Sequence, residues 1–189
     1  MSLYIPESYR STRMVCFDPG LNTTGVSVYD IDSRTKEVLS IYAYTIYTDR
    51  TRDATGLDTE ILTERSHKLY KLCGAIQHTL AEYNPSIVGS EAPFYNRLMP
   101  MAFVSLSEVV SMLRHTTLQY NYNIPFYLVE PQLVKKGVGV AGKKGKQVVM
   151  DAICGVPEIM RALTVPVEGL DEHAIDAIAV GWSMLKFKI

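Results

Sequence analysis

Two acidic residues stand where a folded chain often places its chemistry. Asp18 ends a short apolar run, residues 14–17, and is followed by a Pro-Gly turn, while Glu91 ends a second such run, residues 86–90. Open α/β sheets bind ligands at the carboxyl ends of their strands. If the two runs are neighbouring strands, the two carboxylates lie side by side. The alternative for each acid is that it caps the turn or helix that follows it.

A third group of polar residues begins the last amphipathic segment, residues 170–185, which we expect to be a helix. His173 and Asp176 are three residues apart and share a helix face, and Glu172 can face Asp176 as well. Acids at a helix N-terminus, such as Asp171 and Glu172, are also favoured by the helix dipole alone. Asp176 differs, because it lies inside an apolar run where a carboxylate needs a partner. A metal ion would serve as that partner.

Carboxylates with few nitrogen ligands indicate a particular kind of metal site. Hard oxygen donors suit Mg²⁺ or Mn²⁺. Several carboxylates at strand ends suit two-metal hydrolysis of a phosphodiester, in which one ion helps to form the attacking hydroxide and the other stabilises the leaving oxygen. The spacing indicates this chemistry if Asp18, Glu91 and Asp176 meet in the folded chain.

The apolar pattern predicts the elements that must position these residues. Strands are expected at 14–17, 24–31, 38–47, 86–90 and 125–129, helices at 61–80, 99–120, 146–154 and 170–185, and a loop at 134–145. Three strands in succession form an antiparallel meander, and helical crossovers make the later two parallel to the first. The expected fold class is α/β, a mixed five-stranded sheet flanked by helices. Residues 1–12 are expected to be a flexible N-terminal arm, and 13–189 a single domain.

The composition bounds the class of protein. The 189 residues are 47% hydrophobic with a net charge of −1, which fits one folded domain and argues against disorder. No apolar run approaches the ~18 residues of a membrane span, and the N-terminus resembles no signal peptide. Three scattered cysteines fit neither a disulfide framework nor a zinc site, so we expect a cytoplasmic location with no membrane association. The neutral total argues mildly against nucleic acid as a partner.

One segment departs from this neutral balance. Residues 135–146 contain five lysines and no acid: Lys135, Lys136, Lys143, Lys144 and Lys146. Such a run can be a solvated loop. Its glycines would also let the backbone approach phosphate groups, and Arg50, Arg52 and Arg97 could add to the same rim.

Four blocks together resemble a known family. They are Asp-Pro-Gly-x-x-x-Thr-Gly from Asp18, the strand-end Glu91, the segment 131–142 with its Val-Lys-Lys sequence, and the terminal His-x-x-Asp-Ala from His173. Their order and separations resemble the RuvC-type Holliday junction resolvases of the ribonuclease H-like superfamily, over residues 14–185. The resemblance implies a crossover junction endodeoxyribonuclease, a Mg²⁺-dependent enzyme that resolves four-way DNA junctions by paired phosphodiester hydrolysis.

The resemblance also assigns site residues. Asp18, Glu91, His173 and Asp176 match the catalytic set, which would bind two Mg²⁺ ions, with Mn²⁺ able to substitute. The family often has Asp where His173 stands, so His173 is either a metal ligand or a general acid. Phe94 matches an aromatic wedge that enters the junction, although a lone phenylalanine is more often a core residue.

The remaining predicted DNA contacts are cationic. Arg97 follows the Phe94 position, and either Lys135 or Lys136 matches a phosphate contact of the family. A second family lysine falls on Gly145, which leaves the flanking Lys144 and Lys146, with Lys143 nearby, as candidates.

The segment 99–120 is apolar on more than one helix face. It is either a central core helix or, as the resemblance implies, the contact between two subunits of a homodimer. A two-fold dimer would suit a four-way junction that needs two cuts. Two other functions stay open, a nuclease for flaps or replication forks and a non-catalytic DNA-binding member. The expected location is the cytoplasm of a bacterium or of a virus-infected host cell.

Overall fold

The structure is a computed structural model that describes residues 11–49, 63–142 and 147–189. Several predictions lie outside these residues and stay predictions. They concern arm residues 1–10, the start of the helix expected at 61–80, Arg50, Arg52, Lys143, Lys144 and Lys146.

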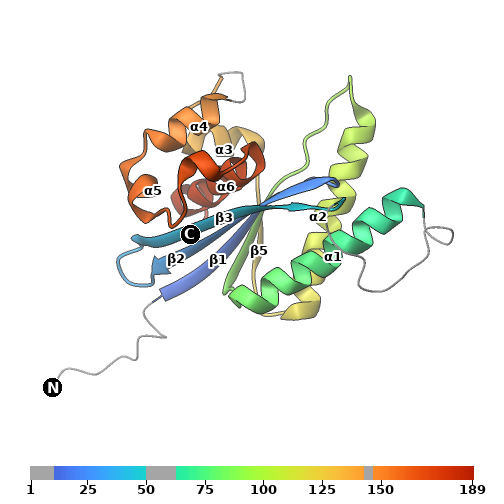
Figure 1. The fold of residues 1–189 in the computed structure, drawn as a ribbon, viewed down its shortest axis with the longest axis horizontal. Coiled ribbons are helices and arrows are strands. Elements are labelled where there is room, and N and C mark those ends of the chain that lie inside the picture. Colours follow the sequence, from blue (N-terminus) through green and yellow to red (C-terminus); the bar gives the residue numbers. More distant parts are fainter. Residues whose placement is uncertain (1–10, 50–62, 143–146) are drawn as a thin grey trace.

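The predicted mixed sheet is confirmed (Figure 1). Its strands are β1 (Ser11–Asp18), β2 (Thr23–Asp32), β3 (Val38–Tyr47), β4 (Ile87–Glu91) and β5 (Phe126–Val129). They lie in the order β3-β2-β1-β4-β5. The first three strands pair antiparallel, whereas β4 is parallel to β1 and β5 is parallel to β4. Strand β1 begins at Ser11, two residues inside the segment predicted to be an arm.

Helices cover both faces of the sheet (Figure 1). They are α1 (Glu64–Tyr83), α2 (Pro100–Tyr120), α3 (Pro131–Gly137), α4 (Gln147–Cys154), α5 (Pro157–Ala162) and α6 (Glu172–Phe187), with a 3₁₀ turn at Val167–Gly169. Helices α1 and α2 pack on one face and α3 to α6 on the other. Among the described residues, no helix has both the length and the apolar character to cross a membrane.

The central strand β1 is buried on both faces, as strands between two helix layers must be. Met14 and Cys16 point into the core shared with α6, whereas Val15 and Phe17 point into the core shared with α1 and α2. This explains why residues 14–17 form a continuous apolar run. The strand therefore holds its terminal Asp18 on a rigid support.

The three cysteines of the chain are free thiols in this structure.

The loop predicted at 134–145 is wrong at its start, because residues 134–137 belong to helix α3. Pro131 occupies a first-turn position, where its fixed φ favours a helix and its missing N–H costs nothing. The glycines of residues 134–145 are typical of a loop, so the sequence pattern did not predict this short helix. Helix α5 was also not predicted, and it too has a proline, Pro157, in its first turn.

Candidate active site

The two strand-end acids are neighbours in space, as predicted. Phe17 of β1 pairs with Ser90 of β4 in the parallel ladder. Asp18 and Glu91 are the next residues of these two strands, at the carboxyl end of the sheet. Both carboxylates are half-buried there.

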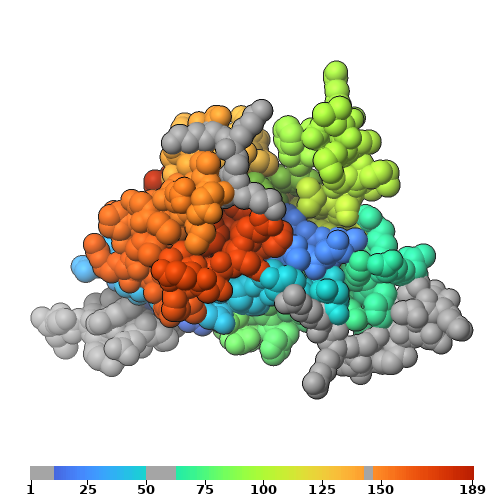
Figure 2. Space-filling view, turned by 45° about the horizontal axis from the view of Figure 1, so that its top comes forward, coloured from blue at the N-terminus to red at the C-terminus, as the bar shows by residue number. Residues whose placement is uncertain are grey.

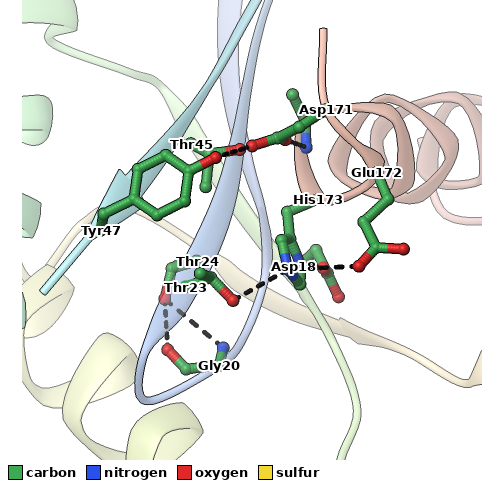
Figure 3. A network of polar contacts seen from close by, with 10 residues as sticks. Asp18, Gly20, Thr23, Thr24, Thr45, Tyr47, Asp171, Glu172 and His173 are labelled. Atoms are coloured by element: carbon green, nitrogen blue, oxygen red, sulfur yellow. Dashed lines mark hydrogen bonds and ion pairs between the residues drawn. The ribbon is translucent and has the colours of Figure 1, made fainter. Parts of the chain in front are cut away.

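Helix α6 brings the third and fourth predicted residues to the same place. His173 Nδ1 lies 3.2 Å from Asp18 Oδ2, and His173 Nε2 lies 2.9 Å from Thr23 Oγ1 (Figure 3). Gly25 of β2 makes this possible, because a Cβ at that position would lie 1.9 Å from the carbonyl oxygen of His173. Any side chain there would push the first turn of α6 off the sheet.

The electrostatics show that the three carboxylates act on one another. Burial, followed by the charges of Asp18 and Asp176, raises the pKa of Glu91 to about 8. Burial and the charge of Asp18 likewise raise the pKa of Asp176 to about 6. The hydrogen bond with Asp18 raises the pKa of His173. The site therefore gathers more negative charge than its own cations balance.

A cavity of about 730 Å³ opens beside these acids. Its wall includes Glu91, Glu172 and Asp176 together with Phe94 and Lys135. It lies between the start of α2 and helices α3 and α4, where the surface in Figure 2 is hollowed between the yellow-green and orange segments. The cavity therefore borders the acidic edge of the sheet.

Only one of the two predicted α3 lysines faces the acids. The charge of Lys135 lowers the pKa of both Glu91 and Asp176. Lys136 instead places its Nζ 5.7 Å from the ring centre of Phe187, at the far end of α6. The lysine at 135 is therefore the one that can meet a group bound in the cavity.

Helix α3 is tightly joined to α6. Ser183 Oγ donates a hydrogen bond to the carbonyl of Val134 at 3.1 Å, and Lys186 Nζ donates to the carbonyl of Gly137 at 2.9 Å. A Cβ on Gly137 would lie 2.1 Å from Ser183 Oγ, so the close approach requires glycine. The position of Lys135 is thus set by α6, the helix that also carries His173 and Asp176.

Phe94 is not a core residue, since 61% of it is exposed. The next residue, Tyr95, packs its ring edge-on against Phe103 of α2, with ring centres 5.5 Å apart. This contact ties the segment after β4 to α2 and leaves Phe94 at the cavity mouth. Arg97 is exposed in the same segment.

The donor chemistry fits a divalent metal ion. Three carboxylates and an imidazole stand at one edge of the sheet, and a cation among them would offset the burial and the repulsion that together raise the pKa of Glu91. Within the described part of the chain, no three Asp, Glu, His or Cys side chains are already arranged around a common point where an ion would sit. The residues that fit are Asp18, Glu91, His173 and Asp176.

The sequence did not reveal what holds the first turn of α6. Asp171 caps the helix by accepting from the backbone N–H of Ala174 at 3.0 Å, which the dipole argument anticipated. Its carboxylate also accepts hydrogen bonds from Thr45 and Tyr47 of β3 (Figure 3). The one signal in the sequence is that residues 45 and 47, two apart on a strand, share a face.

No protein-family model matches the sequence, and no curated protein matches it. The architecture, a mixed sheet in the order β3-β2-β1-β4-β5 with helices on both faces, is nevertheless a ribonuclease H-like fold.

The solved structures with this fold include several resolvases. RuvC of Thermus thermophilus superposes with a TM-score of 0.63 at 17% identity, covering 91% of this chain and 92% of its own, and the same protein in complex with a Holliday junction substrate gives 0.61. The yeast mitochondrial Holliday junction resolvase Ydc2 gives 0.58 at 15% identity, covering 94% of this chain and 79% of its own. The fowlpox virus Holliday junction resolvase gives 0.55 at 12% identity, with 94% and 100% covered. The chain shares its fold with these proteins over nearly its whole length.

Proposed function

We propose that this protein is a Mg²⁺-dependent endonuclease that hydrolyses phosphodiester bonds in branched DNA, with four-way junctions as its main substrate. The observation that carries the proposal is the convergence of Asp18, Glu91 and Asp176 beside Lys135 at the edge of a cavity of about 730 Å³. The support from comparison is the fold shared with resolvases, two of them solved in complex with a Holliday junction.

The proposed roles follow from the chemistry of each side chain. Asp18, Glu91, His173 and Asp176 would hold two Mg²⁺ ions, and Mn²⁺ would substitute because it also accepts oxygen and imidazole donors. When bound, such ions supply an attacking hydroxide and stabilise the leaving oxygen. His173 orients Asp18 through its Nδ1 atom. Lys135 would steady the charge that develops on the scissile phosphate.

Binding of the junction would use the residues around the cavity mouth. The ring of Phe94, which is exposed, would stack on an unpaired base at the junction centre, a contact worth about 1–3 kcal/mol. Arg97, Lys136, Lys143, Lys144 and Lys146 would contact backbone phosphates, which makes binding salt-dependent and largely independent of sequence. Two copies of the chain, joined through α2, would supply the two active sites for paired cuts.

The test is cleavage of a four-way junction, a flap and a linear duplex, each with Mg²⁺ and with a chelator. The wild-type protein should cut the junction fastest and only with the metal. Asp18→Asn should slow cleavage by at least about a thousandfold while junction binding survives in a metal-free gel shift at low salt. In the same assay, Phe94→Ala should slow cleavage of an intact junction.

Asp32→Asn is the matched control, because Asp32 ends β2 at the opposite end of the sheet from the site and serves the β2–β3 turn. It should cut at the wild-type rate. Faster cleavage of flaps than of junctions would favour the alternative substrate. If the wild-type protein binds junctions but cuts no DNA with Mg²⁺ or Mn²⁺, it is a non-catalytic DNA-binding protein, and the proposal is overturned.

A further inference from the structure

A single carboxylate joins the edge strand of the sheet to the helix that carries half of the site. Asp171 Oδ1 accepts from Thr45 Oγ1 at 2.5 Å and from the backbone N–H of Ala174 at 3.0 Å, and its Oδ2 accepts from the Tyr47 hydroxyl (Figure 3). Thr45 and Tyr47 belong to β3, more than 120 residues earlier in the chain. We call Thr45, Tyr47 and Asp171 the β3–α6 clamp.

The clamp does more than a helix cap requires. One side-chain acceptor is enough to satisfy an N-cap, and serine, threonine or asparagine would provide it. Here the carboxylate also satisfies two strand hydroxyls. The charged form, with two oxygens and no donor of its own, is the form that can hold all three donors at once.

The clamp acts at the turn from which two site residues project. His173 follows Asp171 by two residues and contacts Asp18 and Thr23. Asp176 lies one turn further along the same rigid helix. A tilt of that helix would move both side chains relative to Asp18 and Glu91. Misplacement of about 1 Å at a reacting centre can cost about a hundredfold in rate.

We propose that Tyr47 and Thr45 are positioning residues, which hold Asp171 so that the first turn of α6 presents His173 and Asp176 to the strand-end acids. The role in hydrolysis rests on the proposed nuclease function, whereas the effect on the helix does not. Both hydroxyls are bonded to the carboxylate of Asp171. Each acts through Asp171.

The strand offers a matched pair of variants for the test. Tyr47→Phe removes a hydroxyl that contacts α6, whereas Tyr44→Phe removes one that contacts Thr79 of α1 at 2.7 Å on the opposite face of the sheet. Amide hydrogen exchange, thermal midpoint, junction affinity and single-turnover cleavage are measured on both variants and on the wild-type protein, each as the full chain.

The expected result separates positioning from stability. Tyr47→Phe should speed exchange of the amides of residues 174–177 about tenfold and slow single-turnover cleavage by a similar factor, while junction affinity changes less than about twofold. Tyr44→Phe should lower the thermal midpoint comparably and leave both the exchange of these amides and the cleavage rate as in the wild type.

A second variant separates the clamp from the cap. Asp171→Ser keeps a good N-cap acceptor but cannot hold both strand hydroxyls, so it should behave as Tyr47→Phe does. Unchanged exchange at residues 174–177 in Tyr47→Phe, or the same acceleration in Tyr44→Phe, overturns the proposal. If the wild-type protein cuts no DNA, the proposed function fails, and the exchange data alone decide whether the clamp holds the helix.

Discussion

At the scale of single residues, the structure distinguishes two adjacent lysines that the sequence left equivalent. Lys135 lies on the cavity wall and its charge acts on Glu91 and Asp176, whereas Lys136 lies over the ring of Phe187. A cation that faces the reacting phosphate stabilises charge that develops in the transition state, and a cation elsewhere on the surface contributes only to binding.

We therefore expect Lys135→Gln to slow single-turnover cleavage of a saturated junction about a hundredfold. Lys136→Gln should mainly weaken junction binding, with a smaller slope of log affinity against log salt concentration. Gel shifts across a salt series and single-turnover rates measure the two effects separately. Equal loss of rate in both variants would contradict the assignment of Lys135.

The parts of the site that sequence predicted are those with a local signature. Asp18 and Glu91 each end an apolar run, and His173 and Asp176 have helical spacing. The contacts of Thr23 and Tyr47 have no such signature, because they depend on how α6 lies across β2 and β3. These contacts join residues more than 120 positions apart in the sequence. The hydrophobic period of a segment gives no information about such long-range packing.

At the scale of elements, the long strands and helices were predictable because their apolar residues repeat with a clear period. Helix α3 was missed because its seven residues are too few to show a period and lie among glycines. Its proline at the first turn was the available signal. Tertiary contacts with α6, through Ser183 and Lys186, then stabilise a helix too short to form alone.

The pairing of β1 and β2 includes a cross-strand ion pair with a pH-dependent effect. Arg13 and Asp30 are directly opposite in the ladder, and the guanidinium makes two hydrogen bonds to the carboxylate, at 2.7 and 2.9 Å. The hydrogen bond from Arg13 lowers the pKa of Asp30. A carboxyl group with a lowered folded-state pKa adds stability above its unfolded pKa, about 4, and loses that contribution as pH falls through the folded value.

Asp30→Asn should accordingly lower the free energy of unfolding by about 1 kcal/mol at pH 7, a modest value because the pair is partly exposed. The difference between the variant and the wild type should shrink as pH falls below about 4. Urea unfolding at pH values on both sides of this range measures it. A difference that stays constant with pH would show that the charge of Asp30 contributes nothing.

At the scale of the whole molecule, the net charge of −1 conceals a separation of charge. Acids gather at the carboxyl edge of the sheet, where Glu91 and Asp176 already repel each other, and lysines gather in residues 135–146. A bound cation would cancel part of the acidic charge. The neutral total is thus compatible with DNA as a partner, and binding without metal should be weak and steeply dependent on salt.

The surface of α2 bears on the proposed homodimer. From its middle onward the helix buries Val109 and Leu113, whereas its first two turns leave Met101 70% and Val104 51% exposed. The later part of α2 is therefore a core helix, and its exposed first turns are the part available for a subunit contact. Exposed apolar side chains in one patch are typical of protein interfaces. A stable dimer would bury roughly 1,600 Å² in total.

We expect the wild-type protein to sediment at twice the mass of one chain at micromolar concentration, and Val104→Asp to sediment as a monomer, since it would bury an unpaired charge in the interface. Tyr122→Asp is the control, because Tyr122 is 80% exposed and lies beyond the end of α2. It should stay dimeric.

On a plasmid with an extruded cruciform, the dimer should make paired cuts and give linear DNA, whereas the Val104→Asp monomer should give nicked circles. A wild-type protein that is monomeric with junction DNA bound, yet still gives linear product, would show that α2 joins no second subunit and that paired cutting arises from two independent encounters.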